Sequence, residues 1–170
     1  MRLRDAVRMT RDEKLGLFGD GPWVDEPDRC EWRAFGLPCL VLRSRGFGTL
    51  CGYVAVPRSH PLYGRSTLTV VDELEVHGGI TYANRCAGAI CHDPEPGEPG
   101  DVWWLGFNAS HLGDCIPSAD GDLRAHLPEE FQRVLYGDDD PDGPVYRDLA
   151  YMRGECVRLA AQLARYGDAP

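Results

Sequence analysis

The chain has 170 residues, 43% of them hydrophobic, and a formal net charge of −9. This length and composition indicate one globular domain that can bury enough apolar surface to fold without disulfides or metal. The acidic balance argues against nucleic acid as the main partner, because nucleic-acid-binding domains usually carry a basic face. We expect neither a membrane span nor a signal peptide, and therefore a soluble, cytoplasmic protein.

In the first part of the chain, a short N-terminal helix is predicted to precede a β-hairpin. Residues 1–28 form a predicted N-terminal extension, with the helix inside residues 1–19. Residues 37–43 (LPCLVLR) and 49–57 (TLCGYVAVP) are apolar and β-branched, and they flank the turn sequence RGFG. This pattern predicts two strands joined as a hairpin.

Residues 74–83 (LEVHGGITYA) are predicted to form a third strand. Adjacent Gly78 and Gly79 interrupt it, which indicates either a β-bulge or a close approach by another backbone or a ligand. In the second interpretation, backbone N–H groups beside Thr81 would bind an anion such as phosphate. We expect this segment to contribute to a site.

The second half of the chain is predicted to contain one more strand and two helices. Residues 102–107 (VWWLGF) form the predicted central strand, and residues 127–136 a short helix followed by an acidic loop. Residues 145–166 show the clearest pattern, because apolar residues recur at alternating steps of four and three and so predict one apolar helix face. That face consists of Val145, Leu149, Met152, Cys156, Leu159 and Leu163.

These elements together predict a single α+β domain covering residues 1–170. A mainly antiparallel sheet would form its centre, and the C-terminal helix would pack on that sheet.

Polar side chains follow the central strand closely. Asn108, Ser110, His111 and Asp114 occur just after its apolar run is broken at Gly106. Loops that follow a buried strand often carry functional residues, because the strand fixes their position. If the strands at 74–83 and 102–107 pair, His77 would lie near this loop. We therefore predict a site between the VHGG and GFNASHLGD segments.

Two chemical interpretations of this site remain open. His77, His111 and Asp114 are the candidate catalytic residues, since a histidine with a nearby carboxylate can act as a general base. The same three residues, with His60 as a weaker fourth, are also candidate ligands of a divalent metal. In the structural alternative, Asp114 caps a turn and each histidine binds backbone groups.

Further residues are predicted to bind the ligand of this site. Glycine and hydroxyl groups would bind an anion, an aromatic ring would stack on a base, and an arginine would pair with phosphate. These candidates are Gly78, Gly79, Thr81, Asn108, Ser110, Tyr63, Trp104 and Arg58.

The seven cysteines are odd in number and irregularly spaced, and no CxxC pair occurs. We expect them to be reduced and mostly buried, as in a reducing compartment. The run Cys86-x4-Cys91-His92 could bind metal, but the favoured interpretation is unpaired thiols near a loop.

Four segments resemble a family of small uncharacterised proteins from actinobacteria and tailed phages. The segments are GYVAVPRSHPLYG (52–64), LEVHGGITYA (74–83), DVWWLGFNASHLGD (101–114) and YRDLAYMRGECVRLAAQL (146–163). The resemblance implies that they belong to one fold, and it brings no known activity. Small phage proteins of this size include anti-defence factors that bind or degrade nucleotide signals. A phage-encoded member would act in the host cytoplasm.

Three functions follow as hypotheses. The first is a hydrolase of a small nucleotide or other phosphate-bearing molecule, with a divalent metal as a candidate cofactor. The second is a non-catalytic protein that sequesters a nucleotide signal. The third is an interaction module whose polar residues are structural. The expected partner is a small molecule, a membrane partner is not expected, and homo-oligomers are left open.

Overall fold

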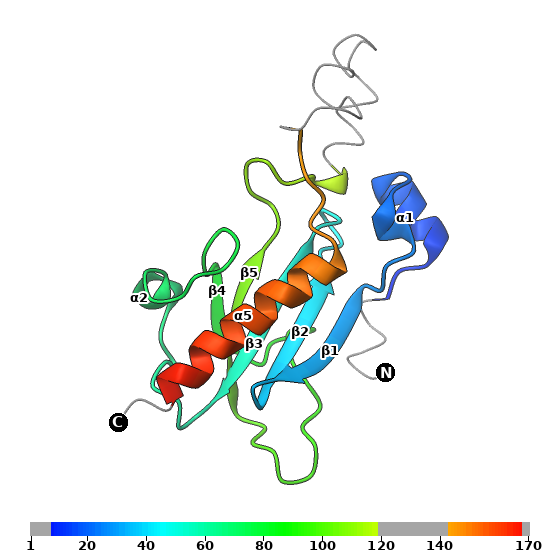
Figure 1. Ribbon diagram of the computed structural model, residues 1–170. Coiled ribbons are helices and arrows are strands. Elements are labelled where there is room, and N and C mark those ends of the chain that lie inside the picture. Colours follow the sequence, from blue (N-terminus) through cyan, green and yellow to red (C-terminus); the bar gives the residue numbers. More distant parts are fainter. Residues whose placement is uncertain (1–7, 119–142, 168–170) are drawn as a thin grey trace.

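The structure is a computed structural model that describes residues 8–118 and 143–167. At its centre lies a five-stranded antiparallel sheet in the order β1-β2-β3-β5-β4. The strands are β1 (Arg29–Ala34), β2 (Leu37–Arg43), β3 (Leu50–Pro57), β4 (Tyr82–Arg85) and β5 (Val102–Asn108). The helices are α1 (Arg11–Phe18), α2 (Thr67–Val70), α5 (Leu149–Gly167) and the short 3₁₀ helix η1 (Pro22–Val24). Helix α5 crosses one face of the sheet (Figure 1), so the predicted α+β class is confirmed.

The hairpin predicted for residues 37–57 is present as β2 and β3, which pair antiparallel. A further strand, β1, precedes it and pairs with β2 through the two-residue turn Phe35-Gly36. Both turn residues have positive φ, +50° and +74°, as a type I′ turn requires. The Phe-Gly dipeptide is not among those that mark such turns, so the sequence did not predict this strand.

The strand predicted for residues 74–83 is wrong over most of its length, because β4 begins only at Tyr82. The predicted bulge is a turn instead, in which the Gly79 N–H donates to the Val76 carbonyl and Gly78 has a φ of +67°. Side chains of α5 form hydrogen bonds with the backbone of residues 75–77, in place of the backbone of a neighbouring strand. Gln162 binds both the N–H and the carbonyl of Glu75, and Glu155 accepts the His77 N–H.

Helix α5 packs chiefly against β2 and β3 through its apolar face. From Met152 to Leu163 the predicted face is fully buried. Gly52 in β3 permits this approach, because a Cβ there would overlap Cys156 Sγ and the Phe107 ring. Val145 departs from the prediction: it precedes the helix, is exposed, and bridges to Asp114 instead.

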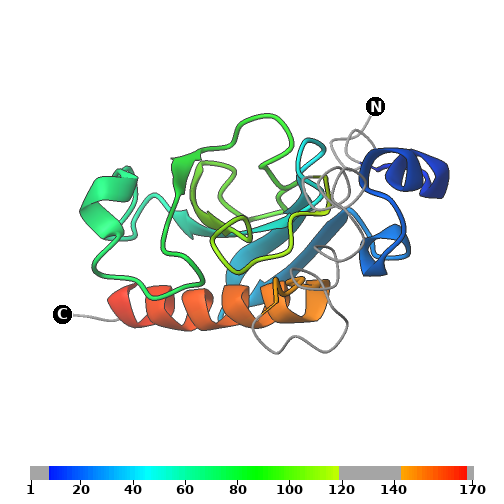
Figure 2. The same cartoon turned by 90° about the horizontal axis from the view of Figure 1, so that it is seen from above.

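The opposite face of the sheet is covered by chain segments without helix (Figure 2). A second apolar cluster lies there, centred on Leu40, Tyr53 and Trp104, with Ala89 and Ile90 packed against it. Trp103 and Trp104 therefore contribute to opposite faces, as the alternation of side chains along a strand requires. The predicted helix at 127–136 lies outside the described residues.

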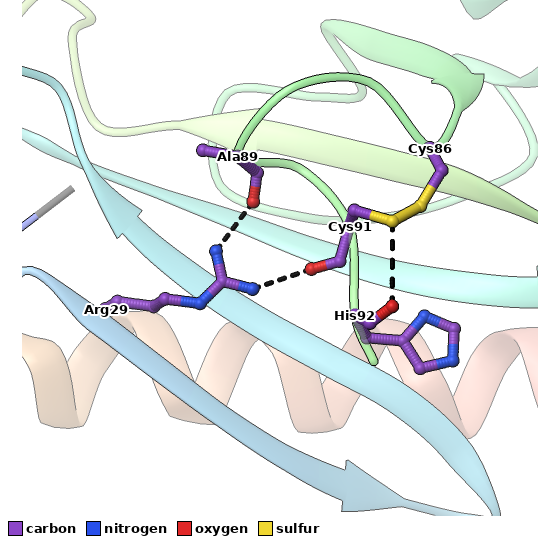
Figure 3. The surroundings of a disulfide bond; sticks show 5 residues. All are labelled: Arg29, Cys86, Ala89, Cys91 and His92. Atoms are coloured by element: carbon purple, nitrogen blue, oxygen red, sulfur yellow. Dashed lines mark hydrogen bonds between the residues drawn. A yellow bond between two sulfur atoms is a disulfide. The ribbon is translucent and has the colours of Figure 1, made fainter. Parts of the chain in front are cut away.

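The expectation that all cysteines are reduced is wrong for one pair, since Cys86 and Cys91 form a disulfide (Figure 3). It closes the turn that leads from β4 towards residue 92, where the two Cα atoms are 4.7 Å apart. The other five cysteines remain thiols, and Cys39 and Cys156 are buried among them. Burial raises the pKa of both of these thiols, so they stay protonated near neutral pH.

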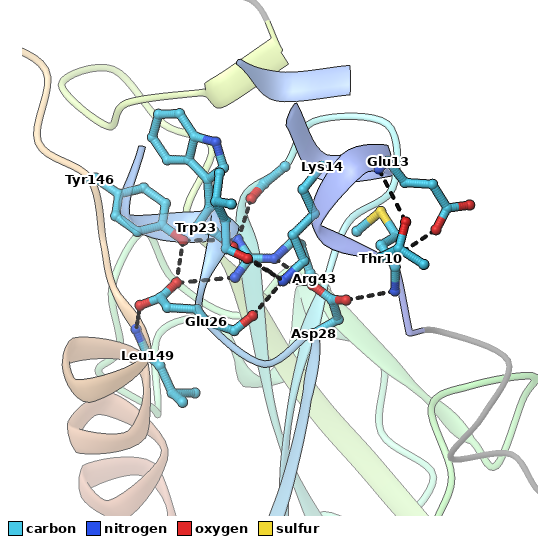
Figure 4. A network of polar contacts seen from close by, with 12 residues as sticks. Thr10, Glu13, Lys14, Trp23, Glu26, Asp28, Arg43, Tyr146 and Leu149 are labelled. Atoms are coloured by element: carbon cyan, nitrogen blue, oxygen red, sulfur yellow. Dashed lines mark hydrogen bonds and ion pairs between the residues drawn. The ribbon is translucent and has the colours of Figure 1, made fainter. Parts of the chain in front are cut away.

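Residues 9–28 attach to the sheet through a buried ionic network (Figure 4). Arg43 in β2 donates to Asp28 at 2.9 Å and to Glu26 at 3.0 Å, and its side chain is inaccessible to solvent. Lys14 pairs with the same Asp28 at 3.0 Å. Tyr146 donates to Glu26, so the network also reaches the segment that precedes α5.

Leu159→Ala should lower the free energy of unfolding by about 2–5 kcal/mol, because Leu159 is fully buried between α5 and the sheet. Val157→Ala is the matched control, since Val157 lies on the same helix and is 40% exposed. Urea unfolding followed by circular dichroism measures both. A loss for Leu159→Ala no larger than that for Val157→Ala would mean that the apolar face of α5 is not packed in solution.

Arg43→Met should destabilise by about 3–5 kcal/mol, because it breaks a buried ion pair and leaves Lys14 as the only cation beside the buried Asp28 carboxylate. Arg58→Met is the comparison: Arg58 pairs with Asp101 at 3.1 Å but is 76% exposed, so about 0–1 kcal/mol is expected. If the two variants unfold at the same urea concentration, the Arg43 network contributes no more than a surface ion pair.

Candidate functional site

The predicted site residues His77, His111 and Asp114 lie together, and three chain segments bring them there. His77 sits in the turn at 76–79, His111 and Asp114 follow β5, and the first turns of α5 lie beside them. The rings of His77 and His111 meet edge to face with their centroids 5.3 Å apart. These three residues with Tyr151 of α5 are called the His77 cluster below.

Asp114 is the buried anchor of the cluster, and its side chain is only 1% exposed. Its Oδ2 accepts from His77 Nε2 at 2.7 Å and from the His111 N–H at 3.0 Å, while Oδ1 accepts from Arg147 Nε at 2.9 Å. Burial alone would raise the pKa of Asp114, but these three donors outweigh it and keep the pKa below its usual value. The carboxylate is therefore charged, and it closes a turn as the structural alternative expected.

His77 uses both ring nitrogens, which determines how a neutral ring would be protonated. Nε2 lies 2.7 Å from the Asp114 carboxylate and Nδ1 lies 2.9 Å from the Tyr151 hydroxyl. A neutral imidazole carries one proton, and a carboxylate can only accept. The proton therefore sits on Nε2, and Nδ1 accepts from Tyr151. The result is a directed chain from the Tyr151 hydroxyl through His77 to Asp114.

His111 is the most accessible imidazole of the cluster, with 32% of its side chain exposed. Its Nδ1 is buried without a hydrogen-bond partner and lies 3.4 Å from Asp114 Oδ2. The ring rests directly on Gly78, where a Cβ would overlap it. Gly78 is thus needed for two reasons, its positive φ and the space it leaves for His111.

Sequence patterns missed Tyr151, Glu155 and Arg147. Tyr151 and Glu155 are four residues apart on α5 and flank its buried face, so both turn towards the segment carrying His77. Arg147 lies just before the helix, with its guanidinium 4.8 Å from the centre of the Tyr151 ring. The four-residue spacing was visible in the sequence, but nothing in it indicated that residues 75–79 cross this helix.

His60, the weaker metal candidate, is a structural histidine. Its Nε2 bonds to the Leu163 carbonyl at 2.8 Å and its Nδ1 accepts the Leu62 N–H at 3.1 Å. Both nitrogens are therefore occupied near the end of α5. This prediction was wrong because a backbone partner satisfies the ring where a metal was expected.

Three predicted ligand-binding residues do not reach the cluster. Tyr63 and Arg58 both bind Asp101, at the end of β5 opposite to His111. Trp104 is fully buried in the apolar cluster on the face away from α5. The sequence identifies aromatic and basic residues, but the side of the sheet on which their side chains lie depends on strand pairing and on the course of the loops.

A small hydrogen-bond network beside the cluster is formed by three of the predicted ligand-binding residues, Asn108, Ser110 and Thr81. The Asn108 amide donates to Thr81 at 3.1 Å and accepts the Ser110 N–H at 3.1 Å. The Ser110 hydroxyl is paired with Thr49 at 2.9 Å. These residues hold the loop after β5 against the chain entering β4, and Gly79 completes the turn beside them.

The cluster also has the composition of a metal site. One ligand atom each from His77, His111 and Asp114 lies within 4.8 Å of the other two. Two imidazoles and a carboxylate are a common ligand set for zinc, and Tyr151 and Arg147 would orient the ligands from behind.

Comparison of the chain with protein-family models, with curated proteins and with solved structures gives no match. The resemblance to small actinobacterial and phage proteins therefore stays a prediction. Among the described residues, no helix has the length and apolar character needed to cross a membrane.

Gly78→Ala should displace the His111 ring and destabilise the protein more than the backbone conformation alone explains. Gly64→Ala is the control, because Gly64 has a similar φ of +79° with open space around it. Forcing an L-residue into this conformation costs about 1–2 kcal/mol, and the overlap with His111 should add at least about 1 kcal/mol. Urea unfolding and the His111 ring NMR signals measure this. Equal costs for both variants would show that His111 is not held against Gly78.

Proposed function

We propose that the protein is a hydrolase of a small phosphate-bearing molecule and that the His77 cluster is its active site. The observation that carries this proposal is the His77 ring bridging the Tyr151 hydroxyl and the buried Asp114 carboxylate. This is the arrangement by which a histidine is oriented and activated as a general base.

In this mechanism His77 Nδ1 removes a proton from the group hydrogen-bonded to it. That group is the Tyr151 hydroxyl, or a water molecule that takes its place beside the exposed ring of Tyr151. The ring becomes an imidazolium, and Asp114 stabilises it through a charge-assisted hydrogen bond without taking the proton. Burial of Asp114 strengthens this stabilisation, because little water screens the pair.

His111 and Arg147 support the choice of a phosphate-bearing substrate. The partly exposed His111 ring lies beside His77, where it can donate a proton to a leaving oxygen. The guanidinium of Arg147 lies over the Tyr151 ring and brings positive charge close to the reacting hydroxyl. A phosphate group approaching Tyr151 would thus meet an imidazole and a guanidinium.

A divalent metal is the second candidate, favoured by the convergence of three ligand atoms. The general-base arrangement and the metal site cannot exist at the same time, because both use His77 Nε2. A metal on His77 Nε2 would occupy the atom that otherwise donates to Asp114, so the single proton of the neutral ring would have to sit on Nδ1. The Tyr151 oxygen would then accept from Nδ1.

The test is turnover of chromogenic phosphate mono- and diesters, namely p-nitrophenyl phosphate and bis-p-nitrophenyl phosphate. His77→Gln should lower kcat by about 10²–10⁴-fold, because the general base is lost. His111→Ala should also lower kcat while the melting temperature changes little. Tyr63→Phe is the matched control, since that hydroxyl binds Asp101 away from the cluster.

A His111→Ala protein that melts far below the parent, yet turns over ester normally in the cold, would contradict the catalytic role. Binding of nucleotides without turnover would instead support the sequestering function. Chelator treatment separates the two chemistries. Loss of activity that added zinc restores in the parent, but not in His111→Ala, would replace the metal-free mechanism with the metal-assisted one.

A further inference from the structure

Tyr151 is the only residue of the His77 cluster with a hydroxyl group, and helix α5 holds it at the surface. The residue is 37% exposed, whereas its neighbour Met152 is completely buried against the sheet. The Tyr151 ring meets the His77 ring edge to face with centroids 5.5 Å apart, and the Arg147 guanidinium lies 4.8 Å from its centre. Contacts within the protein therefore fix the direction of the ring, while solvent and a small ligand can reach it.

The Tyr151 hydroxyl donates its hydrogen bond to a base. Its oxygen lies 2.9 Å from His77 Nδ1, and the Asp114 carboxylate fixes the proton of the neutral His77 ring on Nε2. A hydroxyl that donates to an imidazole oriented by a buried carboxylate has the arrangement of an activated nucleophile.

Tyr63 shows the contrast within the same protein. Its hydroxyl donates to Asp101 at 2.6 Å, and this bond raises the pKa of Tyr63 and lowers the pKa of Asp101. A carboxylate with a lowered pKa is a weak base, so the proton stays on the Tyr63 oxygen. Of these two tyrosines, Tyr151 is the one whose partner can take its proton during a reaction.

The charges at the start of α5 favour a substrate with a single negative charge. Arg147 pairs with Asp114 at 2.9 Å and Arg158 pairs with Glu155 at 3.0 Å, so each guanidinium is balanced by a carboxylate. Asp148, which caps the start of α5, adds a further negative charge. A phosphate monoester carries a charge between about −1.5 and −2 at pH 7, whereas a phosphodiester carries only one negative charge. These surroundings therefore suit the diester better.

We propose that Tyr151 is the nucleophile of the His77 cluster and that it forms a covalent ester with the phosphorus of a phosphodiester. This inference rests on the proposed hydrolase function, and it specifies the substrate class and the first step. The Tyr151 oxygen attacks phosphorus while its proton passes to His77 Nδ1. The bond from phosphorus to the leaving alcohol oxygen breaks, and protonated His111 gives its proton to that oxygen. The Arg147 guanidinium stabilises the negative charge that builds on the Tyr151 oxygen as its proton leaves.

Water completes the reaction with the roles of the two histidines exchanged. It attacks phosphorus and gives a proton to His111, the bond from phosphorus to the Tyr151 oxygen breaks, and His77 returns the proton to that oxygen. The products are an alcohol and a phosphate monoester, and water is the only other reactant consumed. Because each in-line displacement inverts phosphorus, two displacements retain its configuration, whereas direct attack by water inverts it.

Phenylmethanesulfonyl fluoride tests the reactivity of Tyr151 without any need for ester turnover. A tyrosine oxygen attacks its sulfur, fluoride leaves, and the neighbouring base takes the proton. In the full-length parent with a chelator present, Tyr151 should react at least about 10-fold faster than Tyr63, since general-base assistance contributes about 10²–10⁴-fold. Mass spectrometry of peptides measures both rates in one sample.

His77→Gln should lower the Tyr151 rate to that of Tyr63 and leave the Tyr63 rate unchanged. Equal rates for the two tyrosines in the parent, a comparison that needs no variant, would overturn the proposal. A Tyr151 rate that His77→Gln does not change would overturn it as well.

Hydrolysis of one enantiomer of methyl p-nitrophenyl phosphorothioate in ¹⁸O-labelled water tests the covalent step itself. Retention of configuration at phosphorus is expected. Inversion would show that water attacks directly, which overturns the role of Tyr151 and leaves the hydrolase function intact. A kcat/KM for p-nitrophenyl phosphate as high as that for bis-p-nitrophenyl phosphate would overturn the choice of diesters. Fast sulfonylation of Tyr151 without turnover of any ester would instead contradict the hydrolase function and leave Tyr151 as an activated nucleophile.

Discussion

The docking of α5 on the sheet is the constraint on which the rest of the structure depends. Met152, Cys156, Leu159 and Leu163 are completely buried against β2 and β3, and Gly52 allows the close approach. This packing fixes the rotation of the helix about its axis. Tyr151 and Glu155 are consequently turned towards residues 75–79, which the helix binds in place of a neighbouring strand. The geometry of the candidate active site thus depends on the packing of α5 in the core, although the core residues are not part of the site.

The segment just before α5 links two polar centres. Tyr146 and the Leu149 N–H bind Glu26 in the Arg43 network, and between them Arg147 binds Asp114 in the His77 cluster. Carboxylates on both sides, the partly exposed Glu26 and the buried Asp114, therefore hold the segment that leads into the helix. Removal of either carboxylate would free one side of this segment, so each centre helps to position the other through the backbone at 146–149.

The histidines of the described chain show how environment assigns different roles to one residue type. Backbone groups bind both ring nitrogens of His60, and His77 links a hydroxyl to a carboxylate. His92 is partly exposed, but its two ring nitrogens are buried without a partner among the described residues. Only the second arrangement can activate a bound hydroxyl, because it provides both a proton acceptor and a stabilising anion.

The sequence by itself determined the class of fold, the hairpin at 37–57, the strand at 102–107 and the buried face of the C-terminal helix, because these depend on local hydrophobic periodicity. It did not determine the position of that strand, which is fourth in the sheet and not central as predicted. The sequence also placed His77, His111 and Asp114 in one region. Only the tertiary structure decided that Tyr151 and Arg147 join these three residues. It also placed four predicted site residues elsewhere, namely His60, Tyr63, Arg58 and Trp104. The pairing of Cys86 with Cys91 likewise depends on the tertiary structure. The reason is physical: a side chain's partners depend on how distant segments pack, and the periodicity of one segment carries no information about which other segment will cross it.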